Sequence, residues 1–260
     1  MHRLPAKGSV PKCLQKFCGD NPDCRDWESF YGNYPDSYKS LKMEIAKSQG
    51  YLCAYCEEQL PGDAPSQMRI EHFHPKEDVS TSHNWAFDWN NMLVTCHGGS
   101  RKEPEKEEKE GEEKKAIELH CDASKEQIVT PNTCEGYLLN PLTMPAECLF
   151  ELNRTTGELF PNEIICSRVT ITENRYSTVA ELVWKTIRIL GLNCDRLKQN
   201  RLKVIHEFEK IRQGRKHNSR MNKSSIRTAI AEQWFEKPMS FYTTRRILLG
   251  NYAEDIISRQ

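Results

Sequence analysis

The chain lacks long apolar stretches and an overall excess of either charge. No segment contains about 18 consecutive apolar residues, the length that a membrane-spanning helix needs. No apolar stretch with a cleavage site follows Met1, so a signal peptide is not supported. Apolar residues make up only 37% of the 260 residues. We therefore expect a cytoplasmic protein that is not embedded in a membrane.

The charges balance to a net charge of zero, but they are unevenly distributed. Residues 166–260 contain 19 Lys and Arg against 9 Asp and Glu, so the C-terminal part is basic and the rest is acidic. This asymmetry favours contact with a polyanion, although a basic helical face can equally meet an acidic protein partner.

The eleven cysteines do not suit a disulfide framework, because disulfides are rare in the cytoplasm and an odd number cannot be fully paired. Some are expected to bind a metal. The others are expected to be free or buried thiols: Cys13, Cys18, Cys24, Cys134, Cys148, Cys166 and Cys194.

We divide the chain into an N-terminal segment (1–50), a central unit (51–126) and a C-terminal region (127–260). The central unit contains a charged insertion, 101–115, which has no apolar face to pack and is expected to be disordered or exposed. The basic C-terminal region is expected to be mostly helical after a small hairpin.

Local patterns predict an α+β chain in which helices predominate. The first 35 residues are rich in Pro, Gly and Asp, and we expect them to be irregular. The other predicted elements are a helix over 36–50, a short strand within 67–73, and a second strand or turn within 84–95 that then starts a helix. A hairpin is predicted over 149–160, and helices over 179–190 and 197–211.

Four cysteines have the spacing of a structural zinc site. Cys53 and Cys56 are three positions apart, so both sulfurs can reach one tetrahedral ion. A zinc ion held by four thiolates needs a second pair, and Cys96 and Cys121 are the natural completions. Redox motifs share the first spacing, but no βαβ pattern surrounds it here. We therefore predict a structural Zn²⁺ bound by these four residues.

Between and just after these cysteines lie Glu71, His72, Asn91 and Asp122. A divalent metal held by carboxylate or amide oxygens can neutralise a scissile phosphate, and a histidine can remove a proton from water. Neighbouring residues on a strand point to opposite sides, so Glu71 and His72 can share a site only where the strand ends or bulges. The set predicts a phosphodiesterase centre.

The segments RIEHFHPK at 69–76, WNNMLVTC at 89–96 and HCDASK at 120–125 resemble HNH endonucleases of the ββα-metal fold. More closely, they resemble the PtuB-like HNH proteins of Septu and some retron anti-phage systems. The resemblance is strong over about 50–125. It implies a ββα-metal HNH core with structural zinc, embedded in a mainly helical chain.

The resemblance also implies a role for each matched residue. Glu71 falls on the metal ligand and His72 on the general base. Asn91 matches the asparagine that braces the catalytic loop, although Asn90 leaves the register open by one position. Asp122 falls on the last letter of the signature, as an oxygen ligand that suits Mg²⁺ or Mn²⁺.

Two departures from the family pattern leave alternatives open. Gly99 stands where a cysteine is expected, which puts the assignment of Cys121 in question. His97 could be a ligand in place of Cys121 or of the aspartate that follows it, and His74 could replace His72 as the base.

The resemblance implies a nuclease in phage defence that binds its nucleic-acid substrate through backbone charge, with Lys76 and Lys125 near phosphates. It also implies a hetero-oligomer with a PtuA-like ABC-type ATPase and, in a retron, a reverse transcriptase with its RNA–DNA product. The alternative is a catalytically inactive, zinc-stabilised binding or adaptor module.

Overall fold

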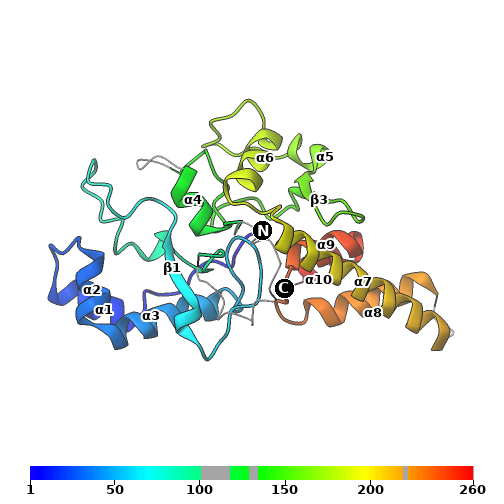
Figure 1. The fold of residues 1–260 in the computed structure, drawn as a ribbon, viewed down its shortest axis with the longest axis horizontal. Coiled ribbons are helices and arrows are strands. Elements are labelled where there is room, and N and C mark those ends of the chain that lie inside the picture. Colours follow the sequence, from blue (N-terminus) through cyan, green and yellow to red (C-terminus); the bar gives the residue numbers. More distant parts are fainter. Residues whose placement is uncertain (101–117, 129–133, 219–221, 260) are drawn as a thin grey trace, which may run out of the picture.

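The structure is a computed structural model that describes residues 1–100, 118–128, 134–218 and 222–259. Within these residues the chain forms helices and two small antiparallel sheets. The predicted α+β class is confirmed. The charged insertion predicted at 101–115 lies outside the described residues. The N-terminal helices lie at one end and the last four helices at the other, with β1 and α4 between them (Figure 1). No helix in the described ranges is long and apolar enough to cross a membrane.

The N-terminal segment forms three helices, α1 (Lys12–Asp20), α2 (Trp27–Asn33) and α3 (Pro35–Ser48). The prediction of irregular structure before residue 35 was therefore wrong. Each of the first two helices buries a pair of apolar residues three positions apart, Leu14 with Phe17 and Trp27 with Phe30. The Asp, Gly and Pro residues that suggested loops lie mainly at their ends, where Asp26 caps α2.

The central sheet pairs β1 (Met68–His72) with β2 (Met92–Cys96). The first strand is as predicted, and the second segment, predicted as a strand or turn that starts a helix, remains a strand up to Cys96. In the antiparallel register, Glu71 faces Leu93 and His72 faces Met92. Short 3₁₀ turns precede the strands, η1 (Pro65–Gln67) and η2 (Trp89–Asn91). The helix α4 (Asp122–Ile128) follows the sheet in sequence.

The C-terminal region begins with the predicted hairpin, in which β3 (Phe150–Leu152) pairs with β4 (Leu159–Pro161). Gly157 takes the positive φ of 75° that its turn requires. The helices that follow are α5 (Glu163–Cys166), α6 (Val179–Ile189), α7 (Asp195–Asn218), α8 (Lys223–Phe235), α9 (Tyr242–Leu249) and α10 (Asn251–Ile257). Helices α7 and α8 run together and extend away from the rest of the molecule (Figure 1).

Candidate active site and thiol cluster

The four predicted cysteines come together in a buried cluster. Their sulfur atoms all lie within 4.8 Å of one another. Individual Sγ–Sγ distances are 3.8 Å for Cys53–Cys121, 3.7 Å for Cys56–Cys96 and 3.8 Å for Cys96–Cys121. A tetrahedral ion with metal–sulfur bonds of about 2.3 Å would separate its sulfurs by about 3.8 Å. The cluster therefore fits a metal ion of the size and geometry of zinc.

Backbone hydrogen bonds bring the first three sulfurs together. The Cys53 and Cys56 turn closes through Glu57, whose N–H donates to the Cys53 carbonyl at 3.0 Å and whose φ of 63° is left-handed. The Ala54 N–H donates to the carbonyl of Val94 at 3.1 Å. This bond attaches the turn to β2, which ends at the third cysteine.

Polar side chains contact two of the sulfurs, those of Cys56 and Cys96. His120 Nε2 lies 3.7 Å from Cys96 Sγ, and Cys56, Glu58, Cys96 and His120 also have ligand atoms within 4.8 Å of one another. Arg196, at the start of α7, donates to Glu58 at 2.7 Å and contacts His120 Nε2. His120 was not predicted to have a role, although its position beside a predicted metal-ligating cysteine was a usable signal.

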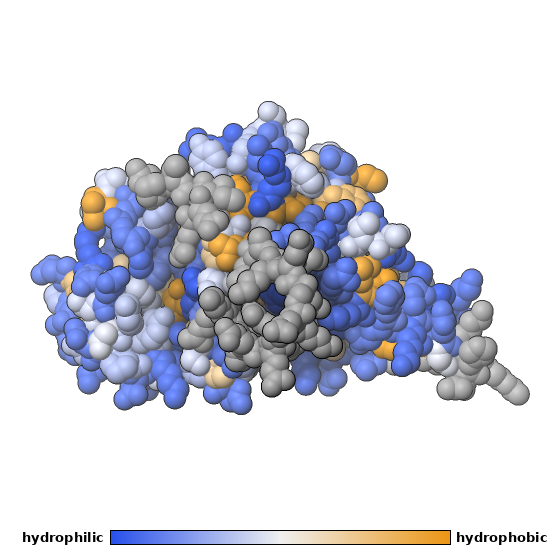
Figure 2. Space-filling model, in the orientation of Figure 1, coloured by the Kyte–Doolittle hydropathy of each residue, from blue (hydrophilic) through white to orange (hydrophobic). Residues whose placement is uncertain are grey.

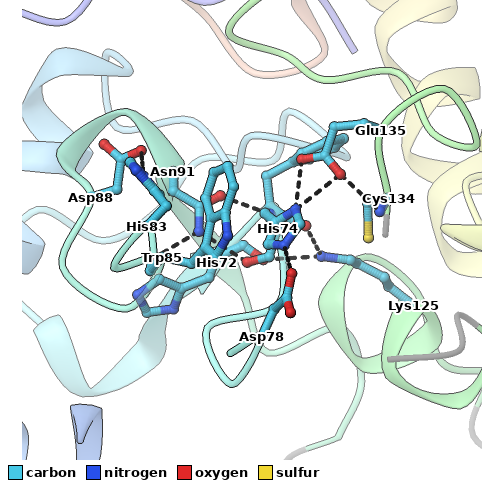
Figure 3. A network of polar contacts seen from close by, with 11 residues as sticks. His72, His74, Asp78, His83, Trp85, Asp88, Asn91, Lys125, Cys134 and Glu135 are labelled. Carbon is cyan, nitrogen blue, oxygen red and sulfur yellow. Dashed lines mark hydrogen bonds and ion pairs between the residues drawn. The ribbon is translucent and has the colours of Figure 1, made fainter. Parts of the chain in front are cut away.

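The two alternative histidines lie in different surroundings. His97 is half-buried, and its Nε2 bonds a main-chain carbonyl 2.9 Å away, outside both groups of possible ligands. His74 stacks on Trp85 at 3.9 Å, with Nδ1 3.0 Å from Glu135 and Nε2 2.8 Å from Asp78 (Figure 3). Because carboxylates engage both of its nitrogens, His74 is poorly placed to accept a proton from water.

Glu71 and Asp122 form a buried pair of carboxyl groups, 7% and 4% exposed, that are close enough to hydrogen-bond. Glu71 accepts hydrogen bonds from Tyr55 Oη at 3.0 Å and Lys125 Nζ at 2.5 Å. Asp122 accepts one from Arg69 at 2.9 Å. Adjacent carboxylate oxygens are the donors that Mg²⁺ and Mn²⁺ prefer, so this pair fits a hard divalent cation.

Burial raises the pKa of Glu71 to about 8, with Lys125 opposing the rise and Asp122 adding to it. Burial disfavours the charge on Lys125, but the combined effect of Glu71, Cys134 and Asp122 is larger, so the pKa of the lysine is raised. The same ammonium donates to the carbonyls of His72 at 3.1 Å and Phe73 at 2.9 Å. Lys125 thus ties α4 to the end of β1, while its predicted contact with a phosphate stays a prediction.

His72 stands at the last position of β1, where the sequence analysis required the strand to end. Its Nε2 lies 2.9 Å from the carbonyl oxygen of Ala86. A carbonyl can only accept, so Nε2 carries the hydrogen and Nδ1 is left to accept a proton. Burial lowers the pKa of His72 to about 4, which keeps the imidazole neutral at pH 7. A neutral imidazole with an accepting Nδ1 has the form that a general base needs.

Asn91 braces the loop between β1 and β2 (Figure 3). Its Oδ1 accepts from the His74 N–H at 2.7 Å, and its Nδ2 donates to the carbonyls of His74 at 2.9 Å and Trp85 at 3.0 Å. Asn90, the other candidate, is exposed. The bracing contacts expected of the family asparagine are thus made by Asn91.

Sequence reasoning missed two further groups at the carboxyl pair. Arg69 lies two positions before Glu71 on β1, so both project from the same face of the strand. This spacing of two residues could have predicted that Arg69 lies on the same face as Glu71. Tyr55 lies inside the first cysteine pair, and no local pattern links it to a glutamate sixteen positions later.

Comparison with known proteins points to the same class as the motifs, the HNH proteins. No family model matches the chain. The chain is 31% identical to the "Retron Ec83 putative HNH endonuclease" of Escherichia coli over 252 residues, which cover 94% of this chain and 92% of that protein. It is 33% identical to the "Retron Vc95 putative HNH endonuclease" of Vibrio cholerae serotype O1 biovar El Tor over 64 residues, 25% of this chain and 30% of that protein. The chain therefore belongs to the family of retron HNH endonucleases.

Proposed function

We propose that this protein is a metal-dependent HNH endonuclease that cleaves phosphodiester bonds in nucleic acid as the effector of an anti-phage system. The observation that carries the proposal is the arrangement around the end of β1. There His72 offers an accepting Nδ1, and the carboxyl group of the preceding residue, Glu71, lies beside that of Asp122.

In this mechanism His72 removes a proton from the attacking water at Nδ1, while the Ala86 carbonyl keeps the other nitrogen protonated. Asn91 holds the loop that follows the base at the end of β1. A Mg²⁺ or Mn²⁺ ion held by Glu71 and Asp122 would neutralise the scissile phosphate and stabilise the leaving 3′ oxygen. The cysteine cluster, loaded with Zn²⁺, would keep these parts in place.

We assign β1, β2 and α4 as the ββα-metal core. Two contacts support the assignment, since Arg69 joins Asp122 and Lys125 joins Glu71, so that α4 is bonded to β1 at two points. Lys76 follows β1 on the loop, where its side chain is 29% exposed and pairs with the neighbouring glutamate. We propose that it contacts a substrate phosphate.

The names of both relatives refer to retrons, which supports a role in a retron or Septu-type system. We propose that the protein works in a hetero-oligomer with a PtuA-like ABC-type ATPase, together with a retron reverse transcriptase and its RNA–DNA product. An ATPase that gates the nuclease would protect the host from unregulated cleavage.

Purification together with the products of the neighbouring genes tests the proposed activity. We expect cleavage of DNA or tRNA with Mg²⁺ or Mn²⁺, its complete loss after EDTA treatment, and its recovery when the cation is restored. Metal analysis should find about one zinc per chain. A complex that binds nucleic acid but cuts neither substrate with either cation would support the adaptor alternative.

The arm formed by α7 and α8 is the second feature that suits a nucleic acid. In the described part of the arm, residues 210–218 and 222–227 contain six Lys and Arg and no Asp or Glu. The face of this arm seen in Figure 2 is mostly hydrophilic. Such a charge excess on a projecting element attracts the phosphate backbone without reading sequence. We propose that the arm contacts the substrate away from the cleaved bond.

Alanine replacement of four described cations in the arm, Lys210, Arg212, Lys223 and Arg227, should weaken binding of long substrates. Each lost phosphate contact lowers the slope of log Kd against log salt by about one, so the slope should fall by up to about four. The kcat should not change. The matched control replaces exposed lysines of α1 and α3: Lys12, Lys16, Lys39 and Lys47. Equal salt slopes in the two variants would argue against substrate binding by the arm.

A further inference from the structure

Trp27, the first residue of α2, meets the proposed base edge-on. The centroids of the Trp27 and His72 rings are 4.5 Å apart, with an angle of 86° between the planes. Both residues are 7% exposed. The hydrogen bond to the Ala86 carbonyl holds one ring nitrogen, and the indole packs against the imidazole ring itself. The two contacts together limit rotation of the ring about its Cβ–Cγ bond.

The indole is itself held by an aromatic cluster. Its ring lies 5.4 Å from Phe30, 5.9 Å from Tyr38 and 5.5 Å from Phe87. Phe87 directly follows Ala86, whose carbonyl binds the imidazole. The same cluster therefore supports both contacts that fix the His72 ring, the indole edge and the carbonyl oxygen.

The N-terminal segment also forms hydrogen bonds with the loop between β1 and β2 at two other places. Arg25 donates to three successive main-chain carbonyls, those of Thr81 at 3.4 Å, Ser82 at 2.7 Å and His83 at 3.4 Å. Near the other end, Trp89 Nε1 donates to the Gly8 carbonyl at 3.0 Å, and the Lys7 ammonium donates to the Trp89 and Met92 carbonyls. The loop is thus attached to residues before α3 along its second half.

From these contacts we propose that Trp27 is a positioning residue for His72, and that the N-terminal helices complete the nuclease centre from outside the ββα core. The proposal rests on the function proposed above. A reacting group must be held close to its productive geometry, and a misplacement of about 1 Å can cost about 100-fold in rate. Trp27 would act on the imidazole without touching the substrate.

The Trp27→Ala variant of the full-length protein, in complex with its partner, tests this role. We expect kcat to fall about 10- to 100-fold while KM and substrate affinity are unchanged, because the indole is buried behind the base. Trp27→Phe keeps an aromatic edge and should recover most of the rate. Tyr31→Ala, on the same helix but 47% exposed, should behave as wild type.

A second readout is independent of cleavage. In ¹⁵N-histidine NMR spectra, His72, assigned with His72→Ala, should show the Nε2–H tautomer in wild type and Trp27→Phe, and averaged nitrogen shifts in Trp27→Ala. If the spectra change as expected but wild type cuts no substrate, the proposed function fails and the positioning role stands. Wild-type kcat and an unchanged spectrum in Trp27→Ala would overturn the positioning role. The positioning role would also be overturned if Trp27→Ala and Trp27→Phe lost kcat to the same extent and lost thermal stability to the same extent.

Discussion

Replacing His72 with alanine should lower the single-turnover cleavage rate by about 100- to 10,000-fold, the usual contribution of a general base. The imidazole offers a proton-accepting Nδ1 at the end of β1, one residue after Glu71, because Nε2 is committed to the Ala86 carbonyl. The substitution leaves Glu71 and Asp122 in place, so the divalent cation should still bind. The measurement is the cleavage rate at saturating Mg²⁺, together with substrate affinity, which should be unchanged.

The matched control is His206→Ala, the same substitution at an exposed position of α7, which should leave the rate unchanged. His74→Ala adds a second comparison. Its imidazole lies between Asp78 and Glu135, so we expect a smaller loss than for His72. A larger loss in His74→Ala than in His72→Ala would indicate that His74 is the base. Full activity in both variants would contradict the nuclease mechanism.

Much of the candidate site could be predicted because short motifs encode it. Cys53 and Cys56 lie within four consecutive residues, so their spacing alone predicts that both can bind one metal ion. Glu71 and His72 fall at the end of a strand that alternation alone reveals. Secondary structure followed the same logic, since the hairpin and α6 depend on local periodicity and turn residues. Elements and site residues that depend on contacts within about ten residues of sequence could therefore be predicted from the sequence.

The parts that could not be predicted depend on contacts between distant segments. Helices α1 and α2 are short, and they are stabilised by burying Phe17 and Trp27 against Phe87, which lies 70 and 60 residues later. The edge contact of Trp27 with His72 has no local signature. Glu135, which binds His74, enters the site from beyond α4. Tertiary packing determines the positions of these residues, and no periodic pattern in the sequence predicts these contacts.

The thiol cluster connects the proposed catalytic centre to the C-terminal helices. Cys121 has a left-handed φ of 55°, its N–H donates to the Leu190 carbonyl at 2.8 Å, and the next residue is Asp122. Arg196 contacts His120 from the start of α7. A metal held by the four sulfurs would therefore fix the position of the aspartate and the attachment of α7 together.

The Cys121→Ser variant should lose its zinc and melt about 10 to 20 °C lower than wild type. A structural zinc contributes many kcal/mol to folding, and for a domain of this size each kcal/mol changes Tm by roughly 2 to 4 °C. A neutral hydroxyl is a poor substitute for a thiolate. Differential scanning fluorimetry and elemental analysis of zinc measure the two effects. Because Asp122 follows directly in sequence, cleavage should be lost even at temperatures where the variant remains folded.

Cys166→Ser is the matched control, since it makes the same change at a buried thiol outside the cluster. Burying a hydroxyl there costs about 1 to 3 kcal/mol, so Tm should fall by about 2 to 12 °C while the zinc stays bound. The contrast separates loss of a ligand from loss of a buried sulfur. If Cys121→Ser kept a full complement of zinc and the wild-type Tm, the ion would have to be held elsewhere. The placement of Asp122 would then need another cause.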